Sequence, residues 1–283
     1  MTTAVSEIRV RSWDQLMREL YSRELIPLRA DEGGHRRSPY VFRGADLDTW
    51  PLETSLKRLQ GISSENTALI EQSLIRSFRK YASAGTFDDK SEWYVLAVAQ
   101  HNGLPTRCLD WASSPLIAAH FACSDEARKT SDGVIWCLHV GALRDINAAN
   151  NSATAKMRGI AWTFDTRLLE SCFSDLAALD GTFQPDEPCS RLMLLWEPPS
   201  IHDRIATQSG LLSIMNSGSG SQQEFLDSYS ERYPKLLKRI VIDSSAKSEI
   251  RDILDQNNVS ERTLFPGLPG LCSWLKRYYG TAW

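Results

Sequence analysis

The chain has 283 residues, of which 42% are hydrophobic and 24% are charged, and its formal net charge is -3. A chain of this length can bury a full hydrophobic core as one large domain or two small ones, and this composition excludes wholesale disorder. The slightly acidic balance argues against a duplex-binding surface spread over the whole molecule, although it leaves room for a local basic cleft.

The six cysteines show no pattern of a metal site or a redox pair, since none lies two or three residues from another. The N-terminus has no apolar segment of a secretory signal, and no run of about 18 apolar residues that would span a membrane occurs in the sequence. We therefore expect a cytoplasmic protein with free thiols and no membrane partner.

The first predicted elements are a short strand and a helix. Residues 7–10 predict an edge strand, and Ser12 offers an N-cap with Gln15 three residues later, which is a capping-box pattern. Residues 39–42 are apolar and aromatic and predict a strand that ends at Arg43. A long helix beginning near residue 65 is predicted from the apolar residues on one of its faces, which are Ile70, Leu74, Phe78 and Tyr81.

Helices and strands then continue without regular βαβ alternation. Residues 92–102 predict a helix with Gly103 as its C-terminal cap, and Ser114 caps another helix that has Pro115 at its first position. Further strands are predicted at residues 134–140, 192–196 and 238–242, and a last short helix at residues 271–279. The mixture favours an α+β fold with short mixed strands and several helices.

Arg43 is the first candidate for a binding residue. It stands at the end of a predicted strand and is followed by Gly44. A guanidinium is a planar donor fork for phosphate or carboxylate, and a glycine beside it allows a ligand to come close. The alternative is a solvated or paired surface charge, and both interpretations remain open at this point.

A dense group of polar residues lies at residues 100–111, which read QHNGLPTRCLDW. We expect this segment to connect two apolar helices, a connection that normally needs only a few residues. Because it carries an imidazole, a guanidinium and a carboxylate, it predicts a ligand site. The candidate residues of this segment are Gln100, His101, Thr106, Arg107, Asp110 and Trp111.

A loop that satisfies its own polar groups is the alternative for the same segment. In that interpretation Asp110 pairs with Arg107, Thr106 caps a turn and His101 bonds a carbonyl. Both interpretations can hold together, because an internal ion pair can position a group that faces a ligand.

Residues 204–210, which read RIATQSG, are the third candidate. The side chains of Gln208 and Ser209, next to Gly210, can bind polar groups of a ligand such as amides, hydroxyls or ribose, and the alternative is a polar turn leading into the following apolar residues. We expect His120 and His139 to be satisfied core histidines. No metal-ligand spacing, phosphate-binding glycine loop or nucleophile elbow occurs in the sequence.

Together these segments resemble the FRG domain, which is named after a Phe-Arg-Gly motif. The motif occurs here at residues 42–44, and the most specific similarity is at residues 100–111, where the family has QH-x-G-x-PTR-x-LDW. Residues 52–58, 204–210 and 264–266 also fit the family's pattern. The resemblance implies an N-terminal strand and helix extension at residues 1–35 and an FRG domain at residues 36–283.

The aromatic-Arg-Gly strand end is also similar to the first motif of arginine-type ADP-ribosyltransferases. That similarity implies an ADP-ribosyltransferase-like fold with NAD as substrate. In this interpretation Arg43 binds the dinucleotide, and Gln100, His101 or Arg107 completes the binding cleft. Trp111 is then expected to stack on a ring of the ligand. It implies binding roles for Gly44, Thr106 and Arg204 as well. The Glu-x-Glu of those enzymes has no clear counterpart, so Asp110 is the expected carboxylate and Gln208 a hydroxyl-binding residue.

Three functions follow as hypotheses. The first is an NAD-using ADP-ribosyltransferase-like enzyme, a toxin or antiviral defence effector with a protein or nucleic-acid acceptor, in which Asp110 stabilises developing positive charge. The second is a binding module that recognises a nucleotide or a nucleic-acid end without chemistry. The third is a phosphodiester hydrolase that uses His101 as general acid or base.

Overall fold

The computed structural model describes residues 5–27, 38–59, 66–83, 85–157, 163–199, 210–217 and 220–280. The fold is α+β and is organised around one mixed sheet with the strand order β1-β8-β4-β2-β3-β7-β6-β5. The strands are β1 (Ser6–Val10), β2 (Tyr40–Ala45), β3 (Leu109–Ala112), β4 (Gly133–His139), β5 (Phe164–Asp165), β6 (Met193–Glu197), β7 (Gly210–Met215) and β8 (Leu237–Ile242).

The sheet has a weak point at its centre. Strands β2 and β3 share a single residue pair, Phe42 with Ala112, whereas β2 pairs with β4 over its whole length. The neighbouring ladders are antiparallel, and only the outermost pairs, β1 with β8 and β5 with β6, are parallel. The sheet is therefore two four-stranded halves that meet at the junction of β2 and β3.

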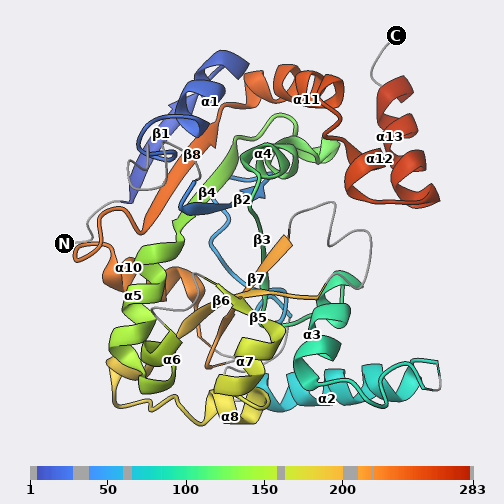
Figure 1. The fold of residues 1–283 in the computed structure, drawn as a ribbon. Coiled ribbons are helices and arrows are strands. Elements are labelled where there is room, and N and C mark those ends of the chain that lie inside the picture. The colour runs from blue at the N-terminus through green and yellow to red at the C-terminus, as the bar shows by residue number, and fades with distance from the viewer. Residues whose placement is uncertain are drawn as a thin grey trace, which may run out of the picture.

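Each half of the sheet carries its own layer of helices (Figure 1). Helices α1, α4 and α11 cover the half that contains β1, β8, β4 and β2, and helices α2, α3, α7 and α8 surround the other half. The helices are α1 (Trp13–Leu20), α2 (Thr67–Tyr81), α3 (Glu92–His101), α4 (Pro115–Cys123), α5 (Val140–Asn150), α6 (Ser152–Met157), α7 (Thr166–Cys172), α8 (Leu176–Asp180), α10 (Gln222–Tyr229), α11 (Lys247–Gln256), α12 (Glu261–Leu264) and α13 (Leu268–Gly280). The described residues also contain three short 3-10 helices, Glu126–Arg128, Pro188–Ser190 and Ser244–Ala246.

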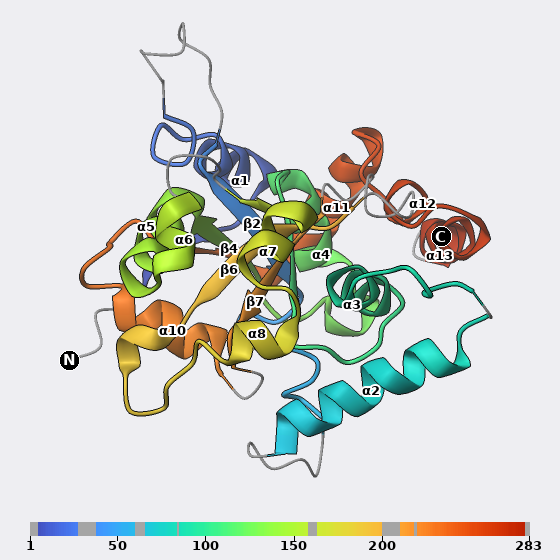
Figure 2. The same cartoon turned by 60° about the horizontal axis from the view of Figure 1, so that its bottom comes forward.

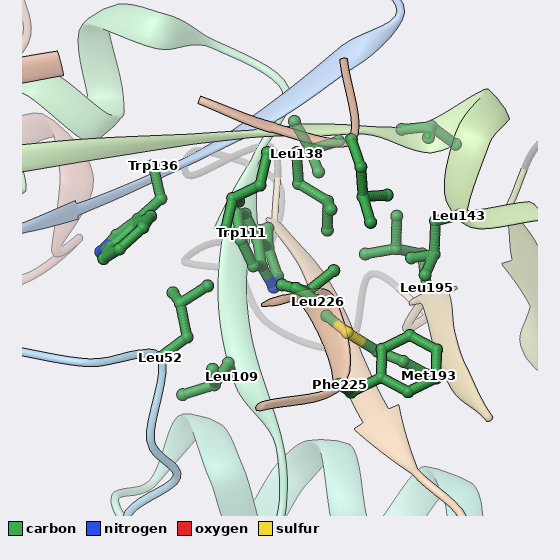
Figure 3. Packing of buried hydrophobic residues seen from close by; sticks show 14 of the residues in the cluster. Leu52, Leu109, Trp111, Trp136, Leu138, Leu143, Met193, Leu195, Phe225 and Leu226 are labelled. Carbon is green, nitrogen blue, oxygen red and sulfur yellow. The ribbon is translucent and has the colours of Figure 1, made fainter. Parts of the chain in front are cut away.

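The two halves share a core on their remaining faces, against α5 and α10. Trp111 of β3 lies in this core with Leu138 of β4, Leu195 of β6 and Phe225 of α10 (Figure 3). Because one apolar cluster is built by strands of both halves, burial holds the halves together where the backbone ladder does not.

Two glycines allow α4 to lie directly on the sheet. A Cβ added to Gly44 of β2 would lie 1.9 Å from the Ala118 carbonyl oxygen, and one added to Gly133 of β4 would lie 2.2 Å from the Ala122 carbonyl oxygen. No side chain fits into such distances, so α4 touches the strand backbone at both positions. The small residues of α4 on this face make the same close approach possible from the helix side.

Most predicted elements are confirmed, with ends shifted by a few residues at most. The strand predicted at residues 7–10 is the edge strand β1, and the strands predicted near residues 134, 192 and 238 are β4, β6 and β8. Ser12 caps α1 as expected, since its hydroxyl accepts from the Gln15 amide, although the Gln15 side chain accepts from Arg11 and not from Ser12. Gly103 follows α3 with φ +83°, as a C-terminal glycine cap requires.

Two predictions of local structure are wrong. Residues 100–111 do not simply connect two helices, because Leu109–Ala112 form the strand β3, where backbone bonds to β7 override the turn-like composition. The apolar face predicted for α2 is also rotated. Tyr81 is 80% exposed, and the buried positions of α2 are Thr67, Glu71 and Ile75, because Glu71 binds an arginine in the interior.

Candidate functional site

A pocket of about 190 Å³ lies over the junction of β2 and β3, between α3 and α4. Figures 1 and 2 both show α3 next to α2, whereas α4 lies on the other half of the sheet. The polar side chains of the pocket come from Arg43, His101 and Asp110. Its apolar wall comes from the β strands and α4, with Ala112, Ile117, Phe121 and Leu212 among the lining residues. The pocket therefore combines one cation, one carboxylate and one imidazole with an apolar wall.

Arg43 reaches across the gap between β2 and β3. Its Nη1 donates to the Asp110 carbonyl oxygen at 2.7 Å and lies 4.0 Å from the Asp110 carboxylate, and its side chain is 23% exposed. Burial lowers the pKa of Arg43, and the Asp110 charge acts in the opposite direction. An arginine nevertheless stays protonated, so Arg43 contributes a charged guanidinium to the lining of the pocket.

Asp110 is held by an amide and keeps contact with solvent. Gln100 Nε2 donates to Asp110 Oδ2 at 2.8 Å, and the Asp110 side chain is 53% exposed. Gln100 in turn accepts a short hydrogen bond from the Thr106 hydroxyl, which itself accepts from the Cys108 amide at 3.1 Å. This relay fixes both the orientation of the Gln100 amide and the position of the Asp110 carboxylate.

Thr106 is in turn anchored by the segment before α2. Its amide donates to the Ser55 hydroxyl at 3.1 Å, and the Leu56 amide donates to the Thr106 carbonyl at 3.1 Å. Thr106 itself is fully buried, so it contacts no ligand and acts through Gln100. The prediction that Thr106 shapes a turn is confirmed, whereas a direct binding role for Thr106 is wrong.

Arg107 belongs to the interior and not to the pocket. Its Nε and backbone amide bind Glu71 of α2, and both terminal nitrogens bind the Asp180 carboxylate of α8. Burial by itself lowers the pKa of Arg107, but the two carboxylates more than offset burial and raise it above its ordinary value. The predicted pairing of Arg107 with Asp110 is therefore wrong, and so is a binding role for Arg107, because two carboxylates elsewhere in the chain saturate its guanidinium.

Two further predicted binding residues serve packing. The Trp111 indole is buried in the shared core, where its Nε1 donates to the Ser213 hydroxyl at 2.8 Å, so the predicted stacking on a ligand ring is wrong. Gly44 borders the pocket, yet its lack of a side chain is required by the approach of Ala118 of α4. The expectation that Gly44 makes room for a ligand is replaced by this packing requirement.

The remaining candidates lie elsewhere. Arg204 and Gln208 are outside the described residues. His120 of α4 is buried, but neither of its ring nitrogens has a hydrogen-bond partner among the described residues, so the expectation of a satisfied core histidine is wrong. His139 is half-buried and caps α5, because its Nδ1 accepts from the Ala142 amide at 3.0 Å.

Some residues of the site carried no recognisable signal in the sequence. Glu71 and Asp180 lie 36 and 73 residues from Arg107, and only the tertiary fold brings them together. Ile117 and Leu212 look like ordinary core residues. The position of Glu71 among the apolar residues of a helix is the one sign in the sequence that this carboxylate binds a partner in the interior.

Neither a metal-binding cluster nor a membrane-spanning helix occurs among the described residues. Within the described ranges, no group of three or more His, Cys, Asp or Glu side chains is arranged to hold a metal ion. None of the described helices combines the length and the apolar composition that crossing a bilayer requires. All six cysteines are free thiols, as their spacing predicted, and three of them are buried.

The comparisons with known proteins identify one family. Residues 38–131 match the FRG domain. No curated protein and no solved structure matches the chain. The matched residues run from β2 to the turn before β4 and supply every wall of the pocket except Gly210, Leu211 and Leu212 of β7. The chain therefore contains an FRG domain, whose Phe-Arg-Gly strand and QH-to-LDW segment meet at this pocket.

Proposed function

We propose that this chain is an NAD-using, ADP-ribosyltransferase-like enzyme whose reaction takes place in the pocket between α3 and α4. The observation that carries the proposal is that Arg43, His101 and Asp110 line one pocket and that Asp110 is not consumed by Arg107. A partly exposed carboxylate next to a guanidinium is the pair that a dinucleotide with a cationic ring and anionic phosphates would use.

Each side chain has a distinct role in this proposal. The bond between the ribose C1′ and the nicotinamide nitrogen breaks, its electron pair leaves with nicotinamide, and the ribose becomes positively charged. Asp110 stabilises that charge, held in place by Gln100. Arg43 binds a phosphate, and His101 takes the proton of the acceptor group that forms the new bond to C1′.

The size of the pocket limits what enters it. Sites that enclose a drug-sized ligand have volumes of about 300–1,000 Å³, whereas this pocket has about 190 Å³. It therefore holds one ring or sugar and leaves the remainder of a dinucleotide outside. The same observation favours a second candidate function, a module that binds the end of a nucleotide without chemistry.

A comparison of matched variants tests the proposal. The release of nicotinamide from NAD and the binding of NAD by calorimetry are measured for the purified protein, for Asp110→Asn and for Arg43→Lys, with Arg79→Lys on α2 as the remote control. Asp110→Asn is expected to lower kcat by roughly 100-fold or more with little change in KM, because it removes charge stabilisation that matters only in the transition state. Arg43→Lys is expected to weaken NAD binding by roughly tenfold, because it removes the donor fork.

The outcomes separate the two candidate functions. Turnover that is lost in Asp110→Asn and kept in Arg79→Lys supports the enzyme. NAD binding without any nicotinamide release, weakened in Arg43→Lys, supports the binding module. The absence of both binding and turnover, with acceptor proteins and nucleic acids supplied, rejects the NAD proposal.

A further inference from the structure

A second hollow, which we call the acidic groove, shares no lining residue with the pocket. It has a volume of about 930 Å³, and its floor is formed by Trp136 of β4 and Arg239 of β8. The loop of residues 48–51 and the helix α10 with the turn after it line its sides. Four carboxylates line it, those of Glu7, Asp48, Asp227 and Glu231.

Arg239, the only cation among the described residues that line the acidic groove, already has partners for both of its terminal nitrogens. Arg239 Nη1 binds the Glu7 carboxylate at 2.6 Å, its Nη2 donates to the Asp48 carbonyl at 2.6 Å, and its guanidinium lies over the Trp136 ring at 4.9 Å. Glu7 alone balances this charge. The carboxylates of Asp48, Asp227 and Glu231 therefore leave a net negative groove that attracts a cation.

The groove also shows which kind of cation its chemistry suits. Each of its two tryptophans already binds an arginine of the chain itself. Trp136 binds Arg239, and Trp50 binds Arg128, whose guanidinium lies 4.7 Å from the centre of the Trp50 ring. Trp50 remains 43% exposed despite that contact. An aromatic ring flanked by carboxylates binds a guanidinium better than an ammonium, because the planar group both stacks and pairs.

The register of the sheet connects the groove with the candidate site. Glu7 pairs with Arg239, Arg239 with Trp136, and Trp136 with Arg43, so four adjacent strands place these residues in one row. Neighbours in such a row are about 5 Å apart and share one face of the sheet. The floor of the groove thus ends one strand from Arg43.

We propose that the acidic groove binds an arginine-rich segment of a partner protein. The volume exceeds what one side chain fills, the charge is complementary to a basic segment, and the rings and carboxylates repeat the arrangement that already holds Arg239. The binding does not depend on NAD. If the proposed function also holds, a segment bound there would approach the pocket and serve as the acceptor.

The test uses the whole chain without NAD. Fluorescence anisotropy measures binding of a short fluorescein-labelled peptide of alternating arginine and glycine. The double variant Asp227→Asn, Glu231→Gln is expected to weaken binding about tenfold, roughly threefold for each carboxylate, and added salt is expected to weaken it as well. The matched control, Glu224→Gln with Asp252→Asn, removes the same charge from exposed positions that do not line the groove, and its expected change is less than about twofold.

Further variants and competitors complete the test. Trp50→Ala is expected to weaken the arginine peptide more than a lysine peptide of the same length. If the groove variant and its control lose equal affinity for the peptide, the loss comes from the change in net charge alone, and the proposal is overturned. No binding of the peptide to the unaltered chain, or equally tight binding of spermidine, would overturn it too. Thermal melts establish that each variant is folded, and because NAD is absent, failure here leaves the NAD experiment unaffected.

Discussion

Replacing Arg107 tests whether this residue of the family motif is structural. Its side chain is 2% exposed and joins Glu71, at 1% exposed, to Asp180, at 28% exposed. Arg107→Met leaves the Glu71 carboxylate buried without its counter-charge, whereas Asp180 can be solvated. Breaking a buried pair in this way costs about 3–5 kcal/mol, which is a large part of the roughly 5–15 kcal/mol that stabilises a typical domain.

A second substitution is expected to restore part of that loss. Glu71→Gln in the Arg107→Met background removes the orphaned charge while its amide oxygen still accepts the backbone N–H of residue 107, as Glu71 Oε1 does at 3.0 Å. We therefore expect the double variant to be more stable than Arg107→Met by about 2 kcal/mol. Two substitutions would then do less harm than one, which is a signature of coupling between the two side chains.

Urea unfolding followed by far-UV circular dichroism measures these free energies, with m-values compared among the variants. Arg76→Met at an exposed position of α2 is the control and is expected to change stability by less than about 0.5 kcal/mol. A loss below about 1 kcal/mol in Arg107→Met would refute the reasoning. So would a double variant that is less stable than the single one.

Two other predictions concern α4. Gly44→Ala would place a Cβ 1.9 Å from the Ala118 carbonyl oxygen, so we expect the free energy of unfolding, measured in urea, to fall by at least about 1–3 kcal/mol. The control Gly280→Ala should change it little, because nothing lies within 4 Å of a Cβ there. An unchanged stability of Gly44→Ala would contradict the close packing of α4 on β2. Burial lowers the pKa of His120 to about 4, whereas a histidine in an unfolded chain has a pKa of about 6.5. Between these two pH values the unfolded state binds more protons than the folded state. The folded state therefore loses stability as the pH falls through this window. Between pH 7.5 and pH 5 the loss attributable to His120 is about 2 kcal/mol, and His120→Leu should remove that part of the pH dependence; equal pH dependence in both proteins would show that His120 titrates normally.

The sequence by itself determined the local elements and the family. Periodicity and caps placed β1, β4, β6, β8 and α3 within a residue or two, because these signals act over a few neighbouring positions. The segment at residues 100–111 identified the FRG domain, since its twelve letters are specific without any knowledge of contacts. Arg43, His101 and Asp110 were also chosen from the sequence, and they do line one pocket.

Only the tertiary structure decided which polar groups meet. Arg107 and Asp110 are three residues apart and of opposite charge, yet Arg107 binds Glu71 and Asp180, and Asp110 binds Gln100. The strand β3 is the physical reason, because pairing with β7 turns alternate side chains to opposite faces, which buries Trp111 and leaves Asp110 at the pocket. A charge in a sequence has many possible partners, and the choice among them is made by long-range packing that no local pattern encodes.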